Sequence, residues 1–195
     1  MLFSAFQKQS LSQLYFSSEE PDFDYCEHYY RITDENIIDK LIGKSKKCGG
    51  PVNQPSHSEV RISKSNSKFI TKYRENLRFF RDFIWSFNLW KNKDLDNWLD
   101  SIKPQIIFFC SANAVFVNII ALYIQKRYNI PIVTYIADDY RKSLIKYGML
   151  TFIHRKLSLI YYKKTLKKAS LSFCISEMMK KEYETYFNVK FYVIN

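Results

Sequence analysis

Alternation between buried-strand patterns and helix patterns is the feature of this sequence that most constrains its fold. Four apolar runs of strand length recur in the second half of the chain, at residues 105–110, 132–137, 171–175 and 189–194. They are separated by stretches with helical character, at residues 114–128, 149–168 and 177–187. Strands that are apolar on both faces and joined by helices form parallel sheets through βαβ crossovers. We therefore predict an α/β fold with a Rossmann-like parallel sheet and helices on both faces.

The first half of the chain is less regular. The run QLYFSS at residues 13–18 predicts a short strand, and Thr33 with two following carboxylates predicts the start of a helix that ends near Ile42. A longer helix is predicted over residues 69–87, and a short one over 95–102. The apolar side chains of the longer helix recur at helical spacing and predict a core-facing stripe made of Phe69, Tyr73, Leu77, Phe80, Ile84 and Phe87.

Residues 43–68 have a different composition from the rest of the chain. They hold three of the four glycines, both Pro51 and Pro55, and six serines, with no periodic apolar pattern. This stretch is longer than the connections that compact domains usually contain. We expect it to be a mobile polar loop.

Composition excludes several classes of site. With only four glycines, the chain has neither G-x-G-x-x-G nor a Walker P-loop. No C-x-x-C pair is present, and Cys110 and Cys174 lie inside apolar runs, where cysteine acts as a small core residue. The three histidines, His154 among them, show no spacing that argues for a catalytic arrangement. We expect no metal and no tightly bound cofactor, and interpret the D-x-D at residues 94–96 as helix-start charge.

Charge is spread unevenly along the chain. The net formal charge is +11, and no acidic residue occurs between Tyr140 and Ser176, where nine Lys or Arg are present. Such asymmetry favours an anionic partner. The N-terminus has no secretory signal pattern and no apolar stretch reaches the length of a membrane span, so we expect a cytoplasmic protein. The basic helix predicts attachment to an anionic membrane surface through Arg155, Lys156, Lys163, Lys164, Lys167 and Lys168.

Polar residues follow three of the predicted strands. In open parallel sheets, ligands bind beyond the carboxyl ends of the strands. The adjacent carboxylates Asp138 and Asp139 are the candidate catalytic residues, because two acids at a strand exit are not simple helix caps. For Ser111 and Ser176, capping of the next helix is the stronger interpretation. The candidate residues lining a ligand cleft at this edge are Ser111, Asn113, Tyr140, Ser176 and Glu177.

Several stretches resemble the N-terminal lobe of bacterial glycosyltransferases of the GT-B fold, from the family-four-like group. The resemblance rests on LSQLYFSSEEPDFDYCEHYYRITDENII, IIFFCSANAVFVNIIAL, NIPIVTYIADDY and SFCISEMMKKEYETYFN. It is strongest over residues 13–34 and 130–140. One departure is that Ala137 stands where many members have a histidine, while Asp138 matches their aspartate. A catalytic histidine is therefore not carried over.

The resemblance implies that residues 1–195 form one acceptor-side lobe, clipped at both ends. The implied reaction transfers a glycosyl group from a nucleotide sugar to a hydroxyl acceptor, without a metal, in envelope, capsule or exopolysaccharide synthesis. The donor-binding C-terminal lobe is then a missing partner or a split subunit. The expected acceptor is a lipid-linked molecule or a glycan, at the inner face of the plasma membrane.

Two other interpretations of the sequence stay open. The basic charge also fits a non-enzymatic module that binds membranes or nucleic acid. No recognised nucleic-acid motif is present, so we expect no nucleic-acid partner. The third interpretation is an inactive remnant of a transferase.

Overall fold

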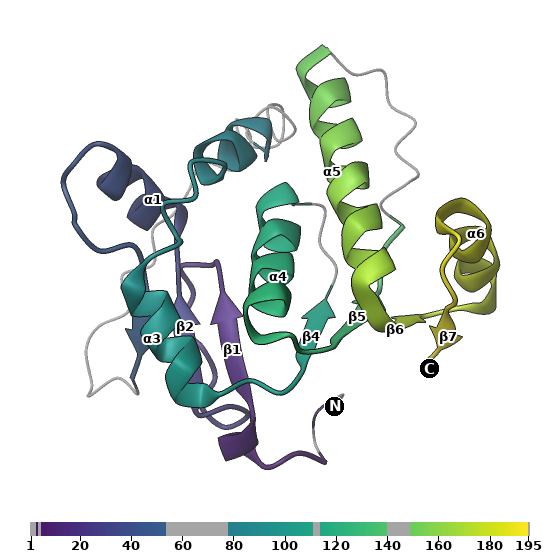
Figure 1. Cartoon of the computed structure of the whole chain (residues 1–195), viewed down its shortest axis with the longest axis horizontal. Coiled ribbons are helices and arrows are strands. Elements are labelled where there is room, and N and C mark those ends of the chain that lie inside the picture. The colour runs from purple at the N-terminus through teal and green to yellow at the C-terminus, as the bar shows by residue number, and fades with distance from the viewer. Residues whose placement is uncertain (1–2, 4, 54–77, 111–113, 140–148, 195) are drawn as a thin grey trace. The chain divides into compact units, whose positions relative to one another are not determined.

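The computed structural model describes residues 3, 5–53, 78–110, 114–139 and 149–194 of the chain (Figure 1). Its contacts divide the chain into two compact units. The first consists of Met1–Tyr73 with Phe83–Lys103, and the second of Arg74–Asp82 with Pro104–Asn195. The single lobe over residues 1–195 therefore stays a prediction.

The second unit contains a parallel four-stranded sheet. Its strands are β4 (Ile107–Cys110), β5 (Ile132–Ile136), β6 (Ala169–Cys174) and β7 (Tyr192–Val193). Their order in the sheet is β4-β5-β6-β7, and every neighbouring pair is parallel. The connecting helices are α4 (Val115–Tyr128), α5 (Met149–Lys168) and α6 (Glu177–Phe187). The predicted α/β class with a Rossmann-like parallel sheet is thus confirmed.

The three connecting helices lie on one face of this sheet and not, as predicted, on both. The reason is that the strand order follows the chain order and parallel crossovers share one hand. On that face, one core cluster joins β5 and β6 to α5 and α6. Its aromatic rings pack edge to face or tilted: Tyr162 lies 5.3 Å from Phe187, and Tyr183 lies 5.4 Å from Phe187 and 5.6 Å from Phe191, between ring centroids. These large rings fix α5 and α6 to each other and to the sheet.

The last strand is shorter than the sequence predicts. Residues 189–194 form only the two-residue strand β7. The reason is that the backbone N–H of Phe191 donates to the Glu184 carboxylate of α6, at 2.8 Å, instead of to a neighbouring strand. This bond turns the chain so that Phe191 enters the core before strand pairing begins.

We expect Phe187→Ala to lower the free energy of unfolding by about 3–5 kcal/mol, because Phe187 is fully buried in this cluster and its removal leaves a cavity. Tyr186→Ala is the matched control on the exposed side of α6, with an expected loss under about 1 kcal/mol. Urea unfolding of both variants measures the difference. Equal losses would contradict the assignment of the core.

The first unit is built on a three-stranded sheet. β1 (Ser12–Tyr15) pairs with β2 (His28–Arg31) in parallel, and β2 pairs with β3 (Gly50–Val52) antiparallel. Its helices are α1 (Asp34–Leu41) and α3 (Lys93–Ile102), and a short 3-10 turn covers Lys8–Ser10. The predicted first strand and both helices are confirmed, and α1 begins with a capping box between Thr33 and Asn36.

Two strands of this unit were not predicted. β2 lies in a stretch with no strand-like alternation, and β3 lies inside the predicted polar loop. The approach of β3 to β2 depends on Gly49, which has φ +83°. A Cβ there would lie 2.5 Å from the Arg31 carbonyl oxygen, so only glycine fits. Within the predicted loop, the described residues 43–53 contain strand β3, and residues 54–68 lie outside the described residues, so the mobility of the loop stays a prediction.

The predicted apolar stripe over 69–87 is partly wrong. Residues 78–85 are helical, but Phe80 and Phe87 are about half exposed, and residues 69–77 lie outside the described residues. The buried side chain near the helix end is Trp85, whose indole N–H donates to Asp34 at 2.7 Å. The sequence did not predict this polar contact at the end of the helix.

Candidate functional site

The carboxyl ends of β4, β5 and β6 meet at one edge of the parallel sheet, where ligands of such sheets bind. Asp138 and Asp139 follow β5 at this edge, and Ser176 and Glu177 follow β6. The structure thus brings these four predicted residues to the same edge. Ser111, Asn113 and Tyr140 lie outside the described residues, so their part in the site stays a prediction.

The two carboxylates after β5 have different surroundings. The hydroxyl of Tyr183, a fully buried residue of α6, lies 3.3 Å from the backbone oxygen of Asp138 and 3.2 Å from Oδ1 of Asp139. Asp139 is half-buried and tied to α6 by this contact, whereas Asp138 is exposed. The Tyr183 contact therefore holds the backbone of the turn, and the Asp138 carboxylate faces solvent.

The residues after β6 act mainly on their own helix. The hydroxyl of Ser176 accepts a hydrogen bond from the backbone N–H of Met179 at 3.2 Å and so caps α6. Glu177 lies in the first turn, where its charge favours the helix, and its carboxylate lies 3.5 Å from the Lys180 amine. The capping interpretation of Ser176 is confirmed.

The two cysteines near this edge do not supply a thiolate nucleophile. Cys174 is fully buried, as predicted, and desolvation raises the pKa of its thiol. The prediction that Cys110 is a core residue is wrong, because this last residue of β4 is exposed. Its sulfur is nevertheless partly desolvated by neighbouring atoms, which raises its pKa. Both thiols are therefore neutral near pH 7.

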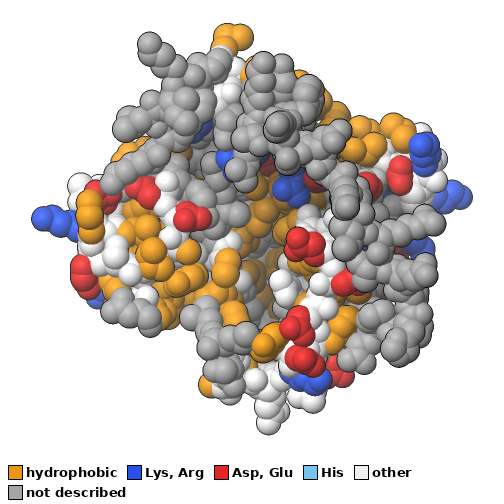
Figure 2. Space-filling model, turned by 180° about the vertical axis from the view of Figure 1, so that it is seen from behind, with side chains coloured by type: hydrophobic (Ala, Val, Ile, Leu, Met, Phe, Trp, Pro, Cys, Tyr) orange, Lys and Arg blue, Asp and Glu red, His pale blue; other side chains and the backbone are white. Residues whose placement is uncertain are grey.

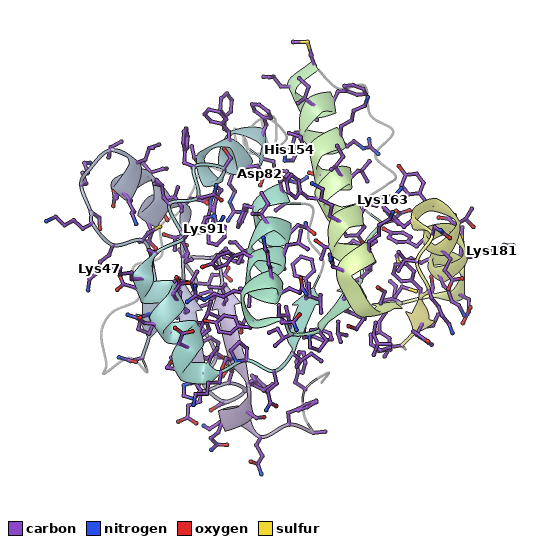
Figure 3. The ribbon with its side chains drawn as sticks, in the orientation of Figure 1. Lys47, Asp82, Lys91, His154, Lys163 and Lys181 are labelled. Atoms are coloured by element: carbon purple, nitrogen blue, oxygen red, sulfur yellow. The ribbon has the colours of Figure 1, made fainter. Side chains whose placement is uncertain are left out.

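The most buried polar contact of the second unit joins Asp82 to His154. The imidazole Nε2 of His154 lies 2.5 Å from Oδ2 of Asp82, and their side chains are 4% and 9% exposed. Figure 3 shows the two side chains next to each other, near the first turn of α4. An ionised carboxylate can only accept, so the imidazole donates. The ring of Phe79 lies edge-on to the imidazole, with 6.4 Å between centroids.

The same carboxylate caps α4. Its Oδ2 accepts from the backbone N–H of Val115 at 3.1 Å, and its Oδ1 accepts from that of Phe116 at 3.0 Å. Ala114, the residue in the N-cap position, has no side chain able to do so. Asp82 thus holds three segments together at the carboxyl edge of the sheet: its own helix, the start of α4 and the second turn of α5.

Sequence reasoning missed this pair, although three signals for it exist. Asp82 lies three residues from both Phe79 and Trp85, so the three residues share one face of the helix. This face is different from the one that the predicted apolar stripe occupied. His154 belongs to a row of polar residues at helical spacing on α5, with Thr151 and Ser158. An apolar N-cap such as Ala114 is a third indication that a distant acceptor is needed.

We expect Asp82→Ala to lower the free energy of unfolding by about 3–5 kcal/mol, because it leaves a buried imidazole and two helix N–H groups without an acceptor. His154→Ala should lower the free energy of unfolding by less, because the N–H groups of α4 keep Asp82 as their acceptor. The double variant should show a coupling energy of about 1–3 kcal/mol in urea unfolding. Strictly additive losses would mean that the two residues do not interact.

The described part of the chain shows neither a metal-binding cluster nor a membrane-spanning helix. Within it, no group of three or more His, Cys, Asp or Glu side chains is close enough to bind a metal ion. Over the same residues, no helix combines the length and the apolar character needed to cross a bilayer.

Comparison with known proteins gives one result. The family model described as Glycosyltransferase Family 4 matches residues 54–195. The match contains the whole parallel sheet, Asp82, His154 and both carboxylates after β5. It does not contain residues 13–34, so the resemblance of that stretch stays a prediction. No curated protein and no solved structure matches the chain.

Proposed function

The chain belongs to Glycosyltransferase Family 4, and on this basis we propose that it takes part in transferring a glycosyl group from a nucleotide sugar to a hydroxyl acceptor. The acceptor is a lipid-linked molecule or a glycan of the bacterial envelope, capsule or exopolysaccharide. The proposed location is the cytoplasmic side of the plasma membrane, where nucleotide sugars are available.

Within this reaction, we propose that the chain supplies the acceptor-side lobe. The donor-binding lobe comes from a further segment or from a separate subunit. Support for this division comes from the sequence, since its four glycines form neither of the two glycine-rich phosphate loops considered above. The acidic turn after β5 also suits an uncharged hydroxyl better than the diphosphate of a nucleotide sugar.

The observation that carries the proposal is the exposed Asp138 carboxylate at the carboxyl edge of the sheet, on a backbone held by Tyr183. In the proposed step, Asp138 accepts the proton of the acceptor hydroxyl while the hydroxyl oxygen bonds to the anomeric carbon. The bond from that carbon to the diphosphate oxygen breaks, and the nucleoside diphosphate leaves. Asp139 and Tyr183 position the turn, and no metal is required from this chain.

Asp138→Asn is expected to lower turnover by about 10²–10⁴-fold, because an amide cannot accept the proton. Asp100→Asn is the matched control, since this carboxylate is exposed on α3 and belongs to the other unit. Turnover is measured in the enzyme reconstituted with its donor-binding lobe. Unchanged unfolding curves for both variants show that the effect is chemical. Full activity of Asp138→Asn would remove this carboxylate from the mechanism.

The purified chain alone is expected to show no sugar transfer, because donor binding requires the other lobe. A radiolabelled nucleotide-sugar assay with lipid and glycan acceptors measures it. Turnover by the chain alone would contradict the proposed division of roles. No turnover after addition of the donor-binding lobe would instead favour an inactive remnant.

A further inference from the structure

Helix α5 has its polar residues inside and its apolar residues outside. Its buried positions include four polar residues: Thr151, His154, Ser158 and Thr165. Its exposed apolar side chains are between 40% and 76% exposed, and they are Met149, Leu150, Phe152, Ile153, Leu157 and Ile160. A helix that only covers a sheet has the opposite arrangement. Leu157 and Ile160 are thus on the exposed side of the helix and not in the core.

The cause of this inversion lies in the contacts already described. His154 must face the buried Asp82 carboxylate, and this contact fixes the rotation of the helix about its axis. Tyr162 and Leu166 then fill the core farther along the same side. Residues one or two positions away, such as Ile153 and Phe152, are turned to the surface because a helix advances 100° per residue.

The exposed face is divided along its length. Its apolar side chains all lie between Met149 and Ile160, and its second half carries the exposed Lys163, Lys164, Lys167 and Lys168. Lys156 lies among the apolar residues in sequence, with its amine 4.7 Å from the centre of the Phe152 ring. Arg155 is half-buried at the side. The helix contains no acidic residue.

The apolar end of the helix extends past the sheet. At 20 residues, α5 is about 30 Å long, whereas the five-residue strand β5 is about 17 Å long. Since α5 ends where β6 begins, its first turns stand beyond the carboxyl edge, as Figure 1 shows. Figure 2, the view from behind, shows a few hydrophobic side chains that project at the upper end of the molecule. The carboxyl edge is the edge that carries Asp138.

We propose that the exposed face of α5 docks on an anionic lipid bilayer. The apolar side chains of its first three turns enter the interface between headgroups and acyl chains, and the lysines of its second half contact lipid phosphates. The docked helix would hold the edge with Asp138 against the membrane. The placing of the Asp138 edge at the membrane rests on the proposed function, because it explains how a lipid-linked acceptor reaches the site. The docking of α5 on the bilayer does not depend on the proposed function.

Charge favours a bilayer over a second copy of the chain as the occupant. Two copies joined through this face would bring their lysines close together without any carboxylate from α5 to offset them. An anionic leaflet instead attracts each of them, and every Lys near such a surface raises the binding constant about fivefold at low salt. The combination of apolar and basic side chains on one helix is typical of segments that lie in the interface.

Co-sedimentation with vesicles tests the proposal on the full chain. Phosphatidylglycerol vesicles should bind it, phosphatidylcholine vesicles should not, and salt should weaken the binding. We expect the variant Phe152→Ser, Ile153→Ser, Ile160→Ser to bind at least tenfold more weakly. The variant Lys163→Gln, Lys164→Gln, Lys167→Gln should lose about 100-fold at low salt.

Each variant has a matched control from outside α5. Met178→Ser with Tyr186→Ser removes exposed apolar side chains of α6, and Lys126→Gln, Lys181→Gln, Lys190→Gln removes the same number of charges. Both controls should bind as the unchanged chain does. Circular dichroism and urea unfolding verify that every variant keeps the fold, which is expected because the replaced side chains are exposed.

Several results would overturn the proposal. They are absence of binding to phosphatidylglycerol vesicles, binding that ignores salt and lipid charge, and equal losses in the α5 variants and their controls. A dimer in light scattering that the Phe152, Ile153, Ile160 variant abolishes would assign the face to a second copy. Because vesicle binding is measured without donor or acceptor, docking by an inactive transferase would contradict only the proposed function.

Discussion

The second unit depends on the hydrogen bonds that the buried Asp82 carboxylate accepts. Helix α4 begins at a residue that cannot cap it, so its first N–H groups need an acceptor from elsewhere in the chain. Asp82 supplies that acceptor, and its Oδ2 also accepts a hydrogen bond from the imidazole of His154 in α5. A buried charge of this kind is tolerated only when hydrogen bonds surround it. The segments that supply these bonds are therefore held in one arrangement.

That arrangement has a consequence at the surface of the protein. With His154 fixed inward, α5 cannot turn its apolar residues toward the core, and they remain exposed beside its lysines. Apolar exposure on this scale favours a partner surface, since single exposed residues are common but a row along one helix is not. The same buried contact thus connects the packing of the unit with the membrane docking proposed above.

Asp138 and Asp139 are adjacent in sequence, but the contacts of Tyr183 give them different roles. Tyr183 reaches from the core of α6 to Asp139 and to the backbone of Asp138. Asp139 is thereby an anchor, and Asp138 is the carboxylate that a hydroxyl group can approach. A turn that is fixed in this way presents its free carboxylate at a constant position, as acid–base chemistry requires.

The sequence by itself determined the fold class, the sites of the main helices and strands of the second unit, and the edge at which Asp138 lies. These follow from local patterns, because apolar runs and helical spacing report which faces are buried. It did not reveal β3, which depends on the close approach permitted by Gly49, or the Asp82–His154 pair, whose members are 72 residues apart. Tertiary structure alone decided which side of α5 faces the core. The buried Asp82 carboxylate needs a hydrogen-bond donor, and this need places the His154 side of the helix inward.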